Sequence, residues 1–425
     1  MPFRIALSGI NAAAAELKAI GNNVANASTT GFKKSRVEFG DVYATSNLGV
    51  SQNAIGSGVR VTSVAQQFSQ GNIGFTNNNL DLAVNGQGFF VLSDGGVPVY
   101  SRSGAFQVDR NGYITNSENQ RLTAYLADPA GNITGSRGDL QLSTADISPQ
   151  ATTDINVVAN LNANATPSAP YPAAPVFNRT DPTTFSNSTA LTVYDSLGNP
   201  VLGTMYYRKT SNPNEWESHL WLTNTAGTPV EVIPVGNVAG QPARVNFSNS
   251  GVITSVTPSV GGTLAIDYGS VNPLTGAANM SFDVDYAAVS QFGSAFSVNA
   301  LTQDGYATGR LSGIDISDTG VVQSRYTNGQ SRALGQVALA NFSNTQGLRQ
   351  LGATAWAETF ESGAALVGQP GAGSLGLVQS GALEGSNVDL TEQLVQMITA
   401  QRNFQANAQV ITAADAITQT IINIR

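Results

Sequence analysis

Histidine and cysteine, the residues that most often act as bases, nucleophiles and metal ligands, are nearly absent from this chain. The one histidine is His219, in the alternating segment 216–221, which predicts a β-strand. A Ser–His–Asp arrangement would depend on this residue alone, and a histidine inside a strand is more often a surface or half-buried side chain than a catalyst. Without cysteine, disulfides, thiolate catalysis and cysteine-based metal sites are excluded. The patterns G-x-S-x-G and H-E-x-x-H and the P-loop are also missing.

One short motif could suggest a nucleotide, because Gly371, Gly373 and Gly376 match the pattern G-x-G-x-x-G. A dinucleotide site needs this pattern inside a βαβ unit, with an acidic residue about 20 positions later. Pro370 precedes the motif and no alternation of strands and helices surrounds it. We therefore interpret 371–376 as a flexible connector.

Aspartates in the segments 94–95 and 109–112 could suggest calcium. Calcium needs six or more oxygen ligands, whereas each segment offers one or two carboxylates, so turn formation explains them better. A pair of carboxylates that hydrolyses sugars stays open, because nothing in the sequence singles out such a pair. The sequence therefore predicts no catalytic residue, no cofactor and no metal site.

Charge is sparse and negative: 11% of the 425 residues are charged, and the formal net charge is −8. Lys33, Lys34 and Arg36 form the one basic cluster, which is too small to replace the counterions along a nucleic acid, so no nucleic-acid partner is expected. Glycine occurs 44 times, which suits many turns. Large uncharged surfaces of this kind are expected to face other subunits.

The N-terminus could be mistaken for a signal peptide, since Arg4 precedes a run of apolar and small residues up to Ala15. Ser8, Gly9 and Asn11 interrupt this run, which favours an amphipathic helix over a signal peptide. No stretch of the sequence approaches the roughly 20 apolar residues that a membrane span requires.

Both ends of the chain carry apolar residues at alternating steps of three and four, which is the spacing of a coiled-coil seam. The spacing predicts α-helices at 3–25 and 390–423, and a capping box of Asp389 and Glu392 starts the second one. Two interpretations stay open, assembly with other copies of the chain or a helical hairpin within a monomer. We favour assembly, because the helices flank the whole chain and have little else nearby to pack on. The predicted seam, through which copies would polymerise, consists of Leu7, Ile10, Ala14, Leu17, Val24, Leu394, Met397, Phe404, Ala408, Ile411 and Ile422.

The middle of the chain follows the period of two that is typical of β-strands, with turn signals at 109–112 and 195–199. Prolines crowd 167–182 and mark the entry into a second β-region. The predicted fold is mainly β and multidomain, with N- and C-terminal α-helices that pair as a coiled coil and with one domain nested inside another. The predicted segments are a helix at 1–30, an irregular connector at 31–70 with a long loop at 47–58, a first β-domain at 71–155 and 287–344, an inserted β-domain at 156–286, a second irregular connector at 345–385 and a helix at 386–425.

Several segments resemble signatures of the bacterial flagellar axial proteins, the family of rod, hook and hook-associated subunits. Within this family the chain is most similar to the hook subunits, because its insertion 156–286 resembles the outer domain of the hook, which the distal rod subunits lack. The matching segments are SGINA at 8–12, GNNVAN at 21–26, GFK at 31–33, LDLAV at 80–84, GFF at 88–90, YSRSG at 100–104, GALEGSNVDL at 381–390 and QRNFQ at 401–405.

The resemblance implies a structural subunit of a bent, tubular homopolymer that acts as a universal joint between the flagellar rod and the filament. It also implies a place in the hook and basal body, export by the flagellar export apparatus without a cleaved signal peptide, and contacts with the distal rod protein, the hook cap and the hook–filament junction proteins. A distal rod or hook-associated axial protein is the alternative. A secreted carbohydrate-active enzyme or adhesin is a remote one.

Overall fold

The computed structural model describes residues 2–42, 56–143, 145–168, 176–223, 227–272 and 276–423. The chain forms two compact units. Unit 1 comprises Met1–Thr144, Ser312–Arg325 and Ser331–Arg425, and unit 2 comprises Ala145–Leu311 and Tyr326–Gln330. Because unit 2 interrupts unit 1, the predicted nesting of one domain inside another is confirmed. Most of the predicted loop 47–58 lies outside the described residues.

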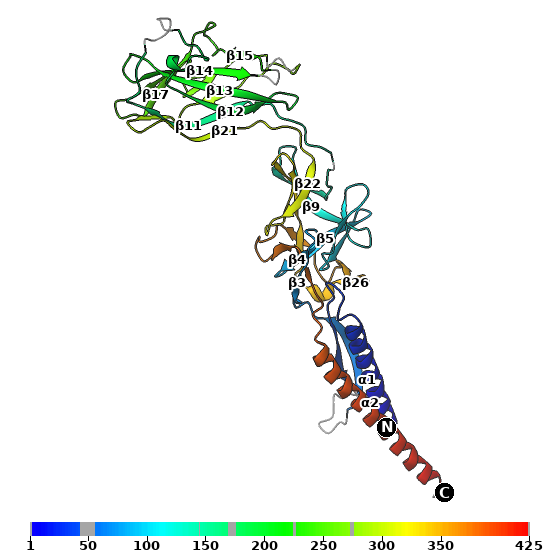
Figure 1. Cartoon of the computed structure of the whole chain (residues 1–425). Coiled ribbons are helices and arrows are strands. Elements are labelled where there is room, and N and C mark those ends of the chain that lie inside the picture. The colour runs from blue at the N-terminus through cyan, green and yellow to red at the C-terminus, as the bar shows by residue number, and fades with distance from the viewer. Residues whose placement is uncertain are drawn as a thin grey trace. The chain divides into compact units, whose positions relative to one another are not determined.

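Two helices, α1 (Pro2–Ala25) and α2 (Leu390–Asn423), lie side by side in unit 1, as Figure 1 shows. They run antiparallel: as α1 advances from Gly9 to Asn23, its contact on α2 moves back from Asn407 to Gln393. At 34 residues, α2 is about 50 Å long, and its last turns extend beyond the described part of α1 (Figure 1). The predicted pairing of the N- and C-terminal helices is confirmed.

Helix α2 starts with half of the predicted capping box. The Asp389 carboxylate accepts hydrogen bonds from the backbone N–H groups of Thr391 and Glu392, at 2.8 and 3.1 Å. The Glu392 carboxylate forms an ion pair with Lys34 at 3.0 Å and accepts a hydrogen bond from Gln396. The predicted return of Glu392 to the Asp389 backbone is therefore wrong, because an ammonium group attracts a carboxylate more strongly than a neutral N–H group does.

The first connector, predicted to be irregular at 31–70, contains an antiparallel hairpin. Strand β1 (Ser35–Asp41) pairs with β2 (Val59–Gln66), and both contact α1, which supplies the support that a two-stranded sheet needs. A bulge shifts the register so that Phe39 pairs with Val61 while Val37 pairs with Val64. The prediction of an irregular connector is therefore wrong for both strands, and the extra residue at the bulge breaks the period of two that would have indicated the hairpin.

A 13-stranded sheet forms the body of unit 1. Its strands are β5 (Phe89–Asp94), β6 (Val97–Ser101), β7 (Gln107–Val108), β8 (Ile114–Thr115), β9 (Arg121–Ala127), β10 (Ile133–Asp139), β22 (Leu311–Ile316), β23 (Val321–Tyr326), β24 (Ser331–Val337), β25 (Leu339–Asn341), β26 (Arg349–Gly352), β27 (Ala355–Ala357) and β28 (Leu366–Gly368). The main path runs β22-β23-β24-β9-β5-β6-β27-β26. An aromatic cluster packs on it, in which Phe89 meets Phe342 and Trp356 edge-on, with ring centroids 5.9 and 5.7 Å apart.

The second connector, predicted to be irregular at 345–385, is also part of this β-structure. Besides the short 3-10 helix η2 (Thr345–Gly347), it supplies three strands of the large sheet and two further pairs. Strand β29 (Leu377–Ser380) pairs with β4 (Leu82–Asn85), and β30 (Ala382–Glu384) pairs with β3 (Ile73–Phe75). Strands of three or four residues contain too few alternations to be recognised from the sequence.

Unit 2 contains a five-stranded and a six-stranded sheet that enclose one apolar core. The five strands are β11 (Asp154–Asn162), β18 (Ala265–Asp267), β19 (Asp283–Asp285), β20 (Ser290–Phe292) and β21 (Ser297–Gln303). The six are β12 (Asn187–Tyr194), β13 (Pro200–Lys209), β14 (Glu215–Thr223), β15 (Pro229–Val232), β16 (Ala243–Phe247) and β17 (Ile253–Thr257), and the 3-10 helix η1 (Pro182–Thr184) precedes β12. Because β20 and β21 both pair with β11, residues 287–311 belong to unit 2, not to the first β-domain as predicted.

Both predicted aspartate turns are confirmed as turns. Asp109 and Asp195 each accept hydrogen bonds from the backbone N–H groups two and four residues ahead, at 2.8 to 2.9 Å. At Gly112 the backbone has φ +84°, and a Cβ atom there would lie 2.5 Å from the carbonyl oxygen of Leu142, so this turn requires glycine. The carboxylates of Asp109 and Asp195 thus bind backbone groups of their own turns.

Buried tyrosines in unit 2 make its stability sensitive to alkaline pH. The hydroxyl groups of Tyr268 and Tyr286 lie 3.2 Å apart, and the Ser218 hydroxyl lies 3.0 Å from that of Tyr286. Burial raises the pKa of Tyr268 to about 12 and raises the pKa of Tyr286 well above its usual range. A raised pKa means that the folded state holds the proton more tightly, so this stability is complete below pH ~10 and is lost as the pH rises toward about 12.

We expect the free energy of unfolding to fall by roughly 2–3 kcal/mol through Tyr268 alone between pH ~10 and pH ~12. Thermal unfolding of the full chain, followed by circular dichroism from about pH 9 to about pH 12, measures this loss. The variant Tyr268→Phe keeps the buried ring but has no proton to lose, so its melting temperature should fall less steeply. Equal slopes for the two proteins would contradict the prediction.

Candidate assembly site

Small side chains make the contact between α1 and α2. On α1 the buried residues Ala6, Ala13 and Ile20 recur at heptad spacing. Gly9 lies among them, and a Cβ atom there would lie 2.4 Å from the amide oxygen of Asn407 on α2. Ala6, Gly9 and Ala13 carry little or no side chain, which allows the two helix backbones to approach closely.

The predicted seam has the right period, but its phase on α1 is displaced by one residue. Leu7 and Ala14 are exposed, whereas Ala6 and Ala13 are buried against the neighbouring elements. The sequence pattern favoured the larger apolar residues, while the close helix contact uses the smaller ones. Of the predicted seam, the structure leaves Leu7, Ala14, Leu394, Phe404 and Ile422 exposed and Ile10, Leu17, Val24, Met397, Ala408 and Ile411 half-buried. Their role in polymerisation stays a prediction.

Helix α2 carries further apolar side chains that α1 does not cover, here called the outer apolar residues. At 100° per residue, five of the six fall within one arc of about 160°, and the sixth, Ile422, lies on the opposite side. An apolar face this wide is normally covered by other elements or by a partner. The outer apolar residues are Leu394, Val395, Ile398, Val410, Ile417 and Ile422, with exposed fractions from 46% to 65%. This surface therefore has the character of an interface with several neighbours.

A buried polar pair fixes the register of the two helices. The Asn23 side-chain amide donates hydrogen bonds to Gln393 Oε1 at 2.9 Å and to the carbonyl oxygen of Ser35 at 2.8 Å. Asn23 Oδ1 accepts from the backbone N–H group of Ser35 at 2.8 Å. A slip of one helix along the other would break the hydrogen bond between Asn23 and the buried Gln393, so the pair favours one alignment. The sequence signal that could have predicted this polar pair is Asn23, an asparagine directly beside Val24 of the predicted seam.

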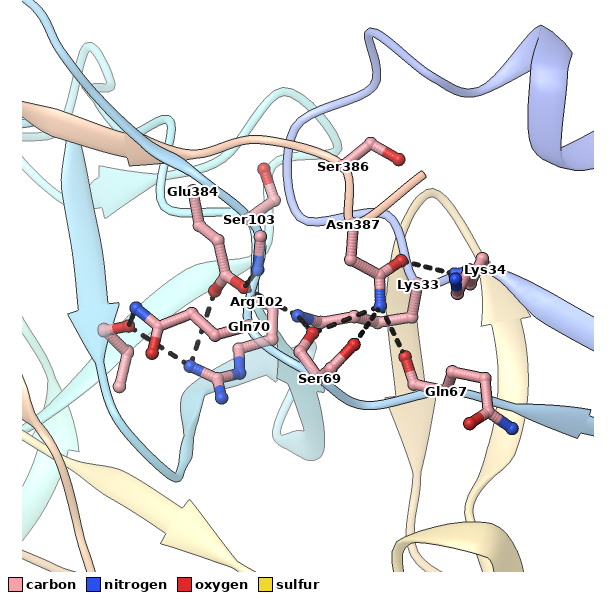
Figure 2. A network of polar contacts seen from close by, with 12 residues as sticks. Lys33, Lys34, Gln67, Ser69, Gln70, Arg102, Ser103, Glu384, Ser386 and Asn387 are labelled. Atoms are coloured by element: carbon pink, nitrogen blue, oxygen red, sulfur yellow. Dashed lines mark hydrogen bonds and ion pairs between the residues drawn. The ribbon is translucent and has the colours of Figure 1, made fainter. Parts of the chain in front are cut away.

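Three buried charged side chains meet where the helices join the strands of unit 1, and we call Lys33, Arg102 and Glu384 the junction cluster (Figure 2). Lys33 Nζ lies 2.6 Å from Glu384 Oε1, and Arg102 Nη1 lies 3.4 Å from Glu384 Oε2. Lys33 Nζ also donates to the carbonyl oxygen of Ser69 at 2.7 Å. The backbone N–H group of Gly71 donates to Glu384 Oε1 at 2.8 Å.

The junction cluster joins segments that are far apart in the sequence. Lys33 follows α1, Arg102 follows β6, and Glu384 ends β30 shortly before α2. Asn387 reinforces the link, because it accepts from the backbone N–H group of Lys34 at 2.7 Å and donates to a carbonyl oxygen of the segment 67–69 (Figure 2). The cluster therefore fastens both helical ends of the chain to the β-structure of unit 1.

Two cations share one carboxylate in this cluster. Burial lowers the pKa of Lys33, and the charge and hydrogen bond of Glu384 oppose this effect. Burial also lowers the pKa of Arg102, again opposed by Glu384. Glu384 therefore stabilises both buried cations, because an unpaired buried charge costs several kcal/mol.

The residues considered for chemistry lie outside these contacts. His219 is buried in β14 with its ring stacked on Phe177, centroids 3.9 Å apart, so it is a core residue of unit 2. The glycine motif closes a turn between β28 and β29, in which Gly371 N–H donates to the carbonyl oxygen of Gly376 at 3.0 Å. Over the described ranges, no group of three or more His, Asp or Glu side chains could hold a metal ion. None of the described helices is long and apolar enough to cross a membrane.

Family models match the chain in four places. The model "Flagella basal body rod protein" matches residues 3–33, and "Flagellar hook protein FlgE/F/G D1 domain" matches 83–160. The model "Flagellar basal body protein FlaE D2 domain" matches 160–306, and "Flagellar basal body rod FlgEFG protein C-terminal" matches 379–424. These matches cover nearly all of both helices, the three residues of the junction cluster and most of unit 2.

Individual proteins match over the whole length. The flagellar hook protein FlgE of Salmonella typhimurium is 36% identical over 430 residues, covering 100% of both chains, and that of Escherichia coli is 35% identical over 432 residues with the same coverage. The FlgE of Treponema pallidum is 32% identical over 99% of this chain and 98% of its own. Among solved structures, that of Helicobacter pylori flagellar hook protein FlgE2 covers 73% of this chain and 100% of its own, with a TM-score of 0.53 and 13% identity, which shows a shared fold.

Proposed function

This chain belongs to the flagellar hook protein family, and from that premise we propose that it is the structural subunit of a bacterial flagellar hook. The observation that carries the proposal is the identity of 36% with a hook protein across 100% of both chains. Such a subunit resides in the hook and basal body and serves swimming motility. Its work is mechanical, so no catalytic residue, cofactor or metal is assigned to it.

The polymer is a tube held together by the terminal helices of many copies. Support comes from the outer apolar residues of α2, most of which share one wide face of the helix and are open to solvent in one chain. The exposed seam residues Leu7, Ala14 and Phe404 add to the same surface. Neighbouring copies cover these side chains, because burying apolar area is the largest favourable term in association. A head-to-tail contact that does not close into a ring produces a helical polymer.

The tube bends and transmits torque as a universal joint. Low charge supports this role: 11% of the residues are charged, so few strong ion pairs must break when one subunit slides against another. The junction cluster, by contrast, fastens the helices firmly to the β-structure of the same subunit. Force applied to the helical tube therefore reaches unit 1 without local unfolding.

The partners of the tube are the distal rod protein at one end and the hook cap and the hook–filament junction proteins at the other, after export through the flagellar export apparatus. A rod or hook-associated role is the alternative, and the match of a D2 domain model to 160–306 favours the hook. The full-length identity with hook proteins leaves a secreted enzyme or adhesin as the remote alternative.

Negative-stain electron microscopy of the purified full chain, concentrated in high salt, tests the proposal. We expect short tubes that curve, whereas straight tubes would favour the rod. A chain that stays monomeric in high salt, even with fragments of hook as nuclei, would contradict the proposed function.

A further inference from the structure

One aromatic side chain of unit 1 stands entirely in solvent. Phe360 has an exposed fraction of 102%, compared with 78% for Phe75 and 52% for Phe3. Phe360 therefore makes almost no contact within its own chain. Aromatic side chains, phenylalanine included, are enriched at the cores of protein–protein interfaces.

The loop that carries Phe360 is tightly held. Ser362 is fully buried, and its hydroxyl donates to the carbonyl oxygen of Thr359 at 2.9 Å. The Thr359 hydroxyl in turn donates to the carbonyl oxygen of Gly347 at 2.6 Å. The side-chain amide of Asn344 donates to the carbonyl oxygen of Glu361 at 3.1 Å. Gly347 packs so closely that a Cβ atom would lie 2.4 Å from the nitrogen of Ser362. Phe360 is thus presented with little conformational entropy left to lose on binding.

Unit 1 also contains a shallow groove that fits such a side chain. Its volume is about 720 Å³. Apolar and small residues line it, with Arg137 as the charged residue among them, and the lining includes Tyr125, Gly135, Leu366, Val367 and Leu375. Arg137 forms no ion pair with any residue that the structure describes, and neither does Glu361, the neighbour of Phe360.

We propose that Phe360 of one copy inserts into this groove of a neighbouring copy, with Glu361 beside Arg137 of that neighbour. The inference rests on the proposed homopolymer and names one of its contacts. The two surfaces are complementary in shape and in charge. Phe360, called the knob below, is apolar like most of the groove lining, and Glu361 next to it is opposite in charge to Arg137 in the groove. Knob and groove are different surfaces of one unit, so the contact is head-to-tail and can propagate along a tube.

Removal of the knob tests the contact. We expect Phe360→Ser to raise the critical concentration for tube formation about 10- to 100-fold in a sedimentation assay. Its thermal unfolding as a monomer should match that of the original chain, because Phe360 has no contacts to lose. Phe75→Ser, which removes another exposed phenylalanine of unit 1, is the matched control and should assemble normally. Assembly of Phe360→Ser at the original concentration would overturn the inference and leave the proposed function intact.

Charge exchange tests the orientation. Glu361→Arg and Arg137→Glu should each raise the critical concentration severalfold, and the double variant should return toward the original value. No recovery in the double variant would overturn the pairing. Failure of the unmodified chain to form tubes would instead overturn the proposed function, and this inference with it.

The absence of cysteine allows a direct measurement. A chain carrying Phe360→Cys and a second chain carrying Gly135→Cys, where a Cβ atom has open space, are mixed, assembled and oxidised. A disulfide-linked dimer that requires both chains is the expected product. Dimers that form equally well from either chain alone would contradict a knob-in-groove contact.

Discussion

Glu384→Gln is expected to lower the free energy of unfolding of unit 1 by roughly 3–5 kcal/mol, the usual cost of breaking a buried ion pair from one side. The substitution preserves the size of the side chain but leaves Lys33 and Arg102 buried without a counter-charge. Lys33 must then lose its proton or draw water into the junction, and Arg102, which stays charged, must draw water in. Because the cluster holds both helical ends, we expect α1 and α2 to detach from the strands before the sheet unfolds.

Hydrogen exchange of the full chain, combined with denaturant unfolding, measures this effect. Glu392→Gln is the matched control, since its ion pair with Lys34 is partly exposed and is worth about 1 kcal/mol or less. We expect faster exchange in α1 and α2 for Glu384→Gln and little change for Glu392→Gln. Similar losses of unfolding free energy in the two variants would show that the junction cluster does not hold the helices to the β-structure.

The double variant Val395→Ser, Ile398→Ser is expected to abolish tube formation at concentrations where the original chain assembles. These side chains are 60% and 51% exposed, so their removal costs the monomer little. Burial of two such side chains in an interface contributes roughly 3 kcal/mol or more, which corresponds to a rise of more than about 100-fold in the critical concentration. Sedimentation and electron microscopy of the full chain report the change.

The control for this experiment removes similar apolar area at the same spacing from unit 2. Val235 and Val238 are 51% and 66% exposed, and Val235→Ser, Val238→Ser should leave tube formation near its original level. Helix content must also be the same in all chains, as measured by far-ultraviolet circular dichroism. Normal tubes from the α2 variant would mean that the outer apolar residues are not the polymerisation surface.

The long periodic elements were predictable from the sequence. Both helices begin and end within about a residue of the predicted positions, because heptad spacing persists over many turns and Asp389 marks a start. The turns at Asp109 and Asp195 were predictable for a similar local reason, since each carboxylate binds backbone groups only two and four residues away. Predictions succeeded where the stabilising contacts lie close along the chain.

The short strands of both connectors were not predictable in this way. Strands β29 and β30 are stabilised by β4 and β3, which lie some 300 residues earlier, and β1 and β2 depend on α1. Three or four residues hold too little pattern to reveal such partners. The predicted boundary of unit 2 was wrong for the same reason. Strands β20 and β21 belong to unit 2 because they pair with β11, and their own sequences carry no signal of that pairing.

The sequence by itself determined the period of the terminal helices, the β-character between them and the nesting of one domain in another. Only the tertiary structure decided which face of each helix is covered, because burying Ala6 in place of Leu7 depends on how closely α2 approaches. It also decided that Lys33, Arg102 and Glu384 form one cluster. Residues separated by up to 351 positions meet there, and no local pattern encodes a contact between segments that only the complete fold brings together.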